Sequence, residues 1–391
     1  MPQKLKGLGC IAFISSFILL AFLRPGADTF FSSWYLGILF SLFLISWEIY
    51  KKTNLVMGLS SFYFPFSAFW VILNYQGNIY KDNTSELRTF FSSECAIGIT
   101  SFILLSSLLF IDFKKEEGRL FFGLLGLSNL ILTLTKIFFP QLETLRYGPS
   151  GIIDLAGING IFIAICLPSM LYLLAKIKGH LGSVLAVLTF ILSFYVIHKS
   201  GSSNAWGVLA VVLVCFFISH RNILFSFFLF LFVFLLAYIS QTSQLFDSTR
   251  RFEAYKVFME FWSNKLPLLW GGGFSSFRAI GPQIQIDKGF LVDVKKGIAE
   301  YFLMLHSDWL QILFETGVIG LVLAISLFGI SAWRLRREPI EFSMLMGFSA
   351  GMVFYYPLHW YYTALIAAYL ITMSHKGEFI RDHGKALSWK N

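Results

Sequence analysis

One polar segment of the chain combines a residue that can handle protons with residues that allow close packing. In HSDWLQILFETGVIG, His306 and Ser307 are followed by nine residues, Gly317, two residues and Gly320. A histidine can be neutral near pH 7, so it can accept a proton from a hydroxyl group. Two glycines three positions apart share one helix face and let a neighbouring helix approach closely. The segment predicts a proton-handling site at the entrance of a close-packed helix. The alternative is an interfacial histidine that only begins a helix.

Three arginines upstream of this segment could bind an anion, namely Arg250, Arg251 and Arg278. Guanidinium groups stay protonated and offer forked donors, so they suit a doubly charged phosphate group. Contact with solvent or with lipid headgroups is the alternative for each of them.

A glycine-rich sequence, KLPLLWGGGFSSF, lies between Arg251 and Arg278. Pro267 predicts the end of the preceding helix, and Gly271 and Gly273 allow the backbone to turn sharply or to approach a ligand. A run of three glycines without the lysine of a P-loop is typical of a turn. A phosphate cradle and a plain turn both stay open.

The composition places these residues in a membrane protein. Hydrophobic residues make up 56% of the 391 residues and charged residues only 14%, with a mean hydropathy of +0.69. A soluble domain does not have this composition. Because a helix needs roughly 20 apolar residues to cross the hydrocarbon layer, we predict an all-α integral membrane protein. Its transmembrane helices, about twelve by this criterion, are expected at residues 8–23, 29–49, 54–75, 91–112, 119–139, 151–174, 181–198, 205–219, 223–240, 305–333, 340–357 and 361–375.

Basic residues fall in every second connection between the predicted spans. They are Lys51, Lys52, Lys114, Lys115, Arg119, Lys176, Lys178, Arg221, Arg334, Arg336 and Arg337, with Lys376, Arg381, Lys385 and Lys390 in the tail. Since short cytoplasmic loops retain Lys and Arg, this alternation predicts that both termini are cytoplasmic. These loops account for most of the net charge of +9 and favour contact with anionic lipids, so nucleic acid is not an expected partner.

Cysteine and acidic residues give little sign of a metal site. The four cysteines all fall in predicted spans without CxxC spacing, which predicts neither a disulfide nor a metal centre: Cys10, Cys95, Cys166 and Cys215. The predicted outer connections contain no DxD sequence, which favours a metal-free site. Asp247, Asp287, Asp293 and Asp308 keep a cation site open as the alternative.

One predicted outer connection, residues 241–304, is about 64 residues long, which is too long for a plain connector. Inside it, RRFEAYKVFMEFW places apolar residues at helical spacing and predicts an amphipathic helix on the membrane surface. These residues are Phe252, Tyr255, Phe258, Met259 and Trp262. We therefore expect three parts: transmembrane helices over 1–240, a large outer loop with amphipathic helices over 241–304, and further transmembrane helices with a tail over 305–391.

The chain resembles the O-antigen ligase and polymerase superfamily of bacterial membrane glycan transferases over roughly residues 200–335. The motifs concerned are GSSNAW, TRRFEAYKVF, PLLWGGGFSSF and the His-Ser, Gly, Gly spacing of residues 306–320. The resemblance implies a GT-C-like architecture in the bacterial inner membrane, with a large periplasmic loop over the active site.

The resemblance also implies an activity. Members transfer a glycan from undecaprenyl diphosphate to an acceptor sugar on the periplasmic face, without a cofactor or metal. His306 would correspond to the family's essential histidine, and Arg250 or Arg251 to an arginine that engages the diphosphate. Arg278 is a further candidate for that contact, and Ser307, Gly271, Gly273, Gly317 and Gly320 would support the site.

One departure from the family pattern concerns the GSSNAW region. Many relatives have an arginine after the serine, whereas here Asn204 follows Ser203. Either another cation replaces it, with Lys199 nearby in the sequence, or the lipid diphosphate is held differently.

Two sister activities share this donor and differ in acceptor. A ligase transfers finished O-antigen to lipid A-core, and a polymerase transfers the growing chain to a lipid-linked repeat unit. The spacing of residues 306–320 favours the ligase, and the missing arginine favours the polymerase. A lipid-linked oligosaccharide transporter is the alternative of another class. Sparse charges within the spans, chiefly Glu48, Glu94, Lys136 and Asp154, and the lack of a visible repeat disfavour it.

Overall fold

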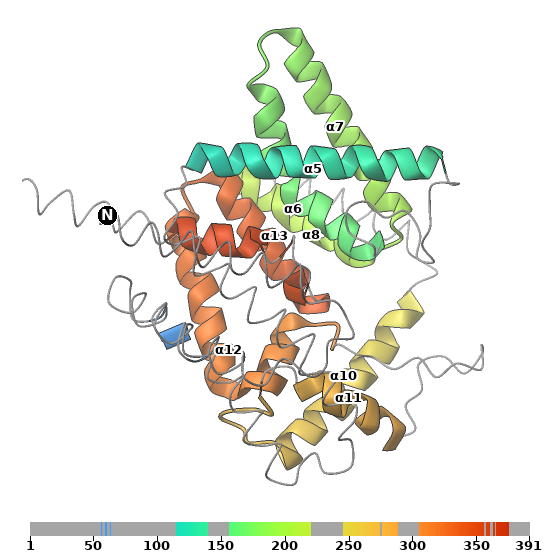
Figure 1. Ribbon diagram of the computed structural model, residues 1–391, viewed down its shortest axis with the longest axis vertical. Coiled ribbons are helices and arrows are strands. Elements are labelled where there is room, and N and C mark those ends of the chain that lie inside the picture. Colours follow the sequence, from blue (N-terminus) through green and yellow to red (C-terminus); the bar gives the residue numbers. More distant parts are fainter. Residues whose placement is uncertain are drawn as a thin grey trace, which may run out of the picture. The chain divides into compact units, whose positions relative to one another are not determined.

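The computed structural model describes residues 115–139, 156–219, 245–273, 276–287, 305–355, 357–359 and 365–374, together with Val56, Leu59, Ser60, Tyr63 and Thr363. Every regular element within these residues is helical (Figure 1). The predicted spans 8–23, 29–49, 91–112 and 223–240, and most of 54–75, lie outside the described residues.

Each predicted span that falls in the described part of the chain coincides with a helix. The helices are α5 (Lys115–Phe138), α6 (Ala156–Ala175), α7 (His180–Lys199), α8 (Ser203–Ser219), α10 (Leu245–Lys265), α11 (Ser276–Asp287), α12 (Asp308–Leu335) and α13 (Pro339–Phe354), with a 3-10 turn η2 (Pro357–His359) and a last apolar helix, Leu365–Ser374. Among them α5, α6, α7 and α12 are long and apolar enough to cross a membrane. The chain is therefore a multi-pass membrane protein.

The chain divides into two compact units. One, which we call the bundle unit, consists of Phe113–Leu245 and Ser331–Ser374 and contains α5, α6, α7, α8, α13 and the last helix. The other, the loop unit, contains α10, α11 and α12 as far as Ile330, together with Tyr63. His306 belongs to the loop unit and Lys199 to the bundle unit.

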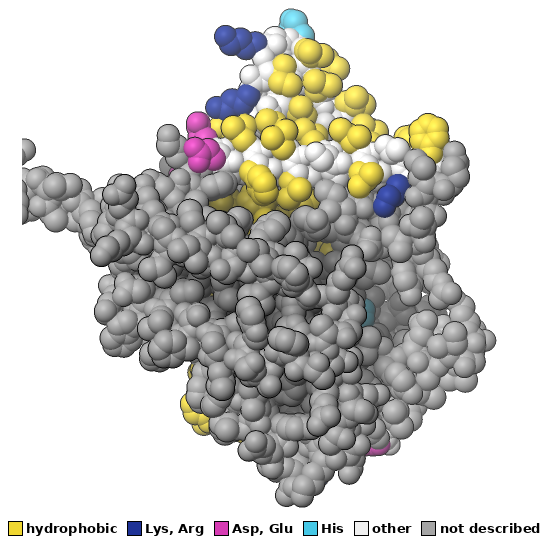
Figure 2. All heavy atoms as spheres, in the orientation of Figure 1, with side chains coloured by type: hydrophobic (Ala, Val, Ile, Leu, Met, Phe, Trp, Pro, Cys, Tyr) yellow, Lys and Arg dark blue, Asp and Glu magenta, His cyan; other side chains and the backbone are white. Residues whose placement is uncertain are grey.

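Helix α6 is the centre of the bundle unit. It contacts α5, α7, α8 and α13, and 78% of its apolar stretch is buried, whereas only 28% of the stretch in α7 is buried. A helix that is apolar on all sides is stable in this enclosed position. Large apolar side chains of α5 and α7 gather on the surface in Figure 2, where lipid would cover them: Phe121, Leu124, Ile131, Leu181, Val184, Val187, Leu188 and Ile191.

Small and polar residues hold α5 against α6. A Cβ atom added at Gly123 would lie 2.6 Å from the carbonyl oxygen of Ser169, so the two backbones approach closely. Farther along, the Asn129 amide donates to the Asn159 side chain at 2.7 Å, and the Asn159 amide donates to Thr133 at 3.0 Å. All three side chains are fully buried. Without water to solvate them, such groups join helices by hydrogen bonding to each other.

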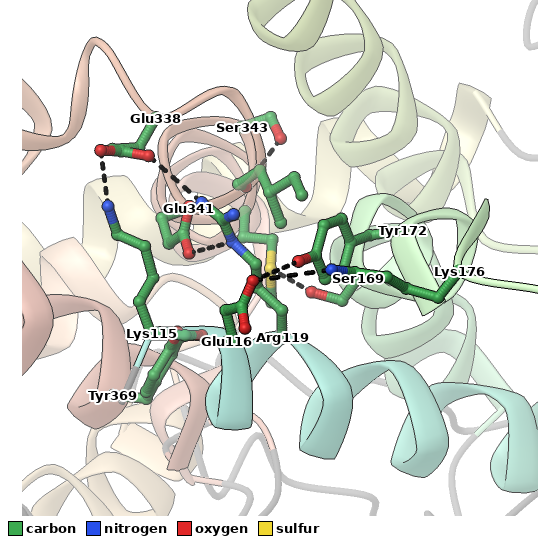
Figure 3. A network of polar contacts seen from close by, with 12 residues as sticks. Lys115, Glu116, Arg119, Ser169, Tyr172, Lys176, Glu338, Glu341, Ser343 and Tyr369 are labelled. Carbon is green, nitrogen blue, oxygen red and sulfur yellow. Dashed lines mark hydrogen bonds and ion pairs between the residues drawn. The ribbon is translucent and has the colours of Figure 1, made fainter. Parts of the chain in front are cut away.

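Charged residues from α5 and α13 meet at one end of the bundle unit (Figure 3). The Arg119 guanidinium donates to both carboxylate oxygens of Glu341, at 2.7 and 2.8 Å, and Glu341 is completely buried. Glu338 forms ion pairs with Lys115 and Arg119. The forked pairing compensates for the removal of Glu341 from water.

The same end of the unit brings together three segments predicted to be cytoplasmic. Glu116 on α5 accepts a hydrogen bond from Tyr172 at 3.3 Å and pairs with Lys176 at 3.6 Å. Elsewhere in the unit, a Cβ atom added at Gly157 would lie 3.0 Å from the Tyr355 hydroxyl, and both residues belong to the ends of predicted spans that face the predicted periplasmic side. The side of the membrane on which these connections lie stays a prediction.

We predict that Glu341→Ala lowers the free energy of unfolding by about 3 kcal/mol, because Arg119 is left without its buried counterion. Glu116→Ala is the control, since its carboxylate is largely exposed and should contribute little. The thermal midpoint of detergent-purified protein measures both. Equal midpoints for the two variants would mean that burial of Glu341 does not matter.

Candidate functional site

A core of aromatic residues organises the described part of the loop unit. The Phe277 ring of α11 packs edge to face against Phe258 of α10 and Phe314 of α12, with centroids 4.7 and 5.3 Å apart. The other buried residues of this core are Ala254, Trp262, Leu266, Ile284 and Leu305. We predicted that the apolar face of α10 lies on a membrane surface, but protein covers it. Periodicity identifies an apolar face without identifying what covers it.

The segment after α10 turns away from the helix as its sequence predicts. Helix α10 ends at Lys265, just before Pro267. Gly271 and Gly273 have φ angles of +68° and +98°, which a residue with a side chain rarely adopts. The N–H group of Gly271 donates to the carbonyl oxygen of Pro267 at 2.7 Å. This favours the turn over the phosphate cradle.

Helix α12 is broken at Gly317, where φ is +68° and ψ is −169°. Two carbonyl groups just before the break are released from the helical hydrogen-bond pattern. The Gly272 N–H group donates to the carbonyl oxygen of Phe314 at 3.0 Å. The Gly273 N–H group donates to that of Glu315 at 2.7 Å. The three-glycine segment therefore supplies the donors that the next turn of α12 would have supplied.

The amide groups just after the break are paired in the same way. Val318 N–H donates to the carbonyl oxygen of Leu268 at 3.0 Å, and Ile319 N–H donates to that of Leu269 at 3.3 Å. Residues 268–273 are thus inserted beside the break in α12. The insertion satisfies backbone groups that would otherwise cost several kcal/mol each in an apolar environment.

The close approach predicted at Gly317 is present, but its partner is the turn formed by residues 268–271 rather than a helix. A Cβ atom added at Gly317 would collide with the carbonyl group of Leu269 and lie 2.6 Å from the Gly271 nitrogen. Gly320 approaches Tyr63, whose ring would be 2.9 Å from an added Cβ atom. A helical spacing of small residues predicts close contact without specifying the contacting element.

Tyr63 joins α12 to the inserted segment. Its hydroxyl group donates a hydrogen bond to the carbonyl oxygen of Thr316 and lies 3.5 Å from that of Leu269. Its ring stacks on Trp270, with centroids 6.1 Å apart. Tyr63 thus binds a carbonyl group that the broken helix leaves without its usual donor.

His306 lies directly before α12, where its backbone has an unusual conformation. Its φ angle is +51°, the only positive φ among the described residues other than glycine. Such a conformation costs about 1–3 kcal/mol and persists only where neighbouring structure enforces it. The residue is half-buried, with Nδ1 in the interior. Ser307 begins the helix, because its hydroxyl oxygen accepts a hydrogen bond from Leu310 N–H at 3.4 Å.

A buried polar stripe follows His306 on the first part of α12. Asp308, Gln311 and Glu315 lie at positions i, i+3 and i+7, so they share one helix face, and each is at most 4% exposed. The Gln311 amide donates to the Glu315 carboxylate at 3.0 Å. Polar groups this deeply buried are normally retained for pairing or chemistry.

The predicted span 305–333 consists of two parts with different surroundings. Before Gly317, Leu305 and Phe314 belong to the core of the loop unit. The large exposed apolar side chains of α12 all come after the break: Val318, Val322, Ile325 and Trp333. Residues 318–335 form about 27 Å of helix, which is close to the thickness of the hydrocarbon layer. The polar stripe therefore precedes the apolar part of α12.

The basic candidates occupy defined helices. Arg250 and Arg251 lie on α10 and Arg278 lies on α11, and their side chains lie outside what the structure describes. Lys199 is exposed at the end of α7, with its ammonium group 5.8 Å from the centre of the Tyr195 ring.

Several residues near His306 and the break were not predicted from the sequence. Glu315 and Gln311 could have been found, because a polar stripe at i, i+3 and i+7 in an apolar helix is a visible signal. Tyr63 could not have been found, because it is far from Thr316 in the sequence and no local sequence pattern links the two residues.

We predict that Gly317→Ala destabilises the protein by about 2–4 kcal/mol, because an added methyl group meets the backbone of residues 269–271 and opposes the positive φ. Gly329→Ala in the same helix is the matched control, since the space beside Gly329 is open. Thermal midpoints in detergent should separate the two variants clearly. Indistinguishable midpoints would contradict the insertion of residues 268–273 at the break.

Residues 156–325 match the family model described as O-antigen ligase (Wzy_C), a range that includes α10, α11, His306 and the break at Gly317. No curated protein gave a significant match. Members of the matched family are membrane enzymes that transfer glycans as ligases or polymerases, and their substrates are lipid-linked glycans. The chain carries an O-antigen ligase family domain over residues 156–325.

Proposed function

We propose that this protein transfers a glycan from undecaprenyl diphosphate to an acceptor sugar at the periplasmic face of the bacterial inner membrane, acting as an O-antigen ligase on lipid A-core. The observation that supports this most is the position of His306. It lies within the range matched by the family, half-buried at the start of α12 and beside a buried polar stripe.

The proposed reaction is a single displacement at the anomeric carbon of the donor glycan. The bond from that carbon to the diphosphate oxygen breaks, and its electron pair leaves with the diphosphate. The acceptor hydroxyl oxygen forms the new bond from the opposite face, so the anomeric configuration inverts. His306 orients the hydroxyl group and takes its proton, which requires a neutral imidazole.

Arginine side chains on α10 and α11 are proposed to stabilise the leaving diphosphate. Negative charge grows on the diphosphate as the bond breaks, and fixed cations in a poorly solvated site favour that change. Arg250, Arg251 and Arg278 belong to the same unit as His306, whereas Lys199 belongs to the bundle unit. Metal ions and other cofactors have no part in this proposal.

An O-antigen or other surface polysaccharide polymerase is the second candidate, favoured by one observation. Asn204 follows Ser203 where many relatives have arginine, so the donor diphosphate could be bound in a different way. Both candidates use the same donor and the same proposed role for His306.

Lipopolysaccharide gels of a deletion strain distinguish the two candidates. Loss of O-antigen from the core while lipid-linked polymer accumulates supports the ligase. A core that carries a single repeat unit supports the polymerase. A normal ladder would exclude both.

We predict that His306→Ala reproduces the banding of the deletion strain although the protein is inserted and folded. The rate of transfer from donor lipid isolated from that strain should fall by about 10²- to 10⁴-fold, the range of general acid–base assistance. His359→Ala is the control, because His359 is also predicted to lie at the outer interface but is outside the motif. Equal losses in the two variants, or normal turnover of His306→Ala, would make His306 structural.

We predict that Arg250→Ala or Arg251→Ala strongly lowers transfer, with lysine restoring only part of it because an ammonium group lacks the forked donors. Initial rates at saturating donor, normalised to protein amount, give the measure. Full activity in both alanine variants would move the diphosphate contact to Arg278 or Lys199.

A further inference from the structure

The side chains of Tyr255 and Gln311 hold the backbone on either side of His306. The Tyr255 hydroxyl of α10 donates to the carbonyl oxygen of His306 at 2.9 Å. The Leu305 N–H group donates to the Gln311 side-chain oxygen at 3.3 Å. Both contacts fall where the chain passes through the positive φ of +51°.

The orientation of Gln311 is set in turn by Glu315. A glutamine amide can present either its oxygen or its nitrogen, and only the oxygen can accept the Leu305 N–H group. The Glu315 carboxylate accepts from the Gln311 nitrogen at 3.0 Å, which directs the Gln311 oxygen toward Leu305. Gln311 and Glu315 are each only 4% exposed, so water does not compete for these bonds.

The segments before and after His306 are anchored by further contacts. Leu305 is buried in the aromatic core, and Ser307 begins α12 through its hydrogen bond with Leu310. His306 therefore connects two anchored residues, and its conformation depends on rotation of the peptide groups around it. The Tyr255 hydroxyl group restricts that rotation at the carbonyl side.

We propose that Tyr255 and Gln311, the latter oriented by Glu315, are positioning residues that hold His306 in the conformation needed for catalysis. This inference rests on the proposed function, because it assumes that His306 takes part in glycan transfer. Tyr255 and Gln311 act only through His306 and do not touch the substrate. A small displacement of a catalytic group reduces turnover more than substrate binding, so these residues affect kcat rather than KM.

The test is a double-mutant cycle with Tyr255→Phe, which removes one hydroxyl group and keeps the ring. Transfer is measured with purified full-length protein and donor lipid isolated from the deletion strain. With His306 present, Tyr255→Phe should lower kcat by about ten-fold and change the donor KM by less than about two-fold. In the His306→Ala background, the same substitution should change the residual rate by less than about two-fold.

Gln311→Met supplies a second, independent arm, because it removes the amide and nearly keeps the volume. In the same double-mutant cycle, we expect Gln311→Met to lower kcat when His306 is present and to have little effect in the His306→Ala background. Ser263→Ala is the matched control on α10, since its hydroxyl group donates to the carbonyl oxygen of Glu260 in the same helix, at 3.0 Å, and lies eight positions beyond Tyr255. It should leave kcat and KM unchanged.

The outcomes separate this inference from the proposed function. Normal turnover of His306→Ala overturns the role of His306, and this inference with it. A strong defect of His306→Ala together with normal kcat in Tyr255→Phe overturns positioning alone. Equal losses from Tyr255→Phe with and without His306 also overturn it, because the hydroxyl group would then act through overall stability.

Discussion

Backbone hydrogen bonding at the break in α12 is the constraint on which the loop unit depends. Once Gly317 leaves the helical conformation, the carbonyl groups of Phe314 and Glu315 and the N–H groups of Val318 and Ile319 need new partners. Residues 268–273 supply all of them, and they can do so only because Gly271 and Gly317 have no Cβ atoms at the contact. The position of the loop on α12 follows from this pairing.

The break also separates two environments along one helix. Before it, the helix contributes Phe314 to an aromatic core and places Gln311 and Glu315 in the protein interior. After it, apolar side chains such as Val322 and Ile325 are exposed, as expected for a surface that faces lipid. A polar stripe next to His306 is compatible with a membrane protein because protein, and not hydrocarbon, surrounds it.

The same rule applies in the bundle unit, where two groups of buried polar side chains pair with one another. Asn129, Asn159 and Thr133 bond to each other between α5 and α6, and Glu341 meets the Arg119 guanidinium with both oxygens. An isolated member of either set would be costly in an apolar bundle. These contacts fix which helices are neighbours, while apolar contacts alone would permit sliding between them.

The sequence by itself determined the class of protein and the helices in the part of the chain that the structure describes. Apolar stretches predict α5, α6 and α7, Pro267 predicts the end of α10, and the spacing from His306 to Gly320 predicts a close contact, because all these signals are local. The tertiary structure decided the partners. It placed residues 268–273 at Gly317, where the spacing predicted a helix. Protein packs against the apolar face of α10, which periodicity alone predicted to lie on a membrane. Tyr63 and Tyr255 reach backbone groups that are far away in the sequence. No periodicity encodes such pairings, since they depend on where the folded chain leaves a carbonyl or amide group without a helical neighbour.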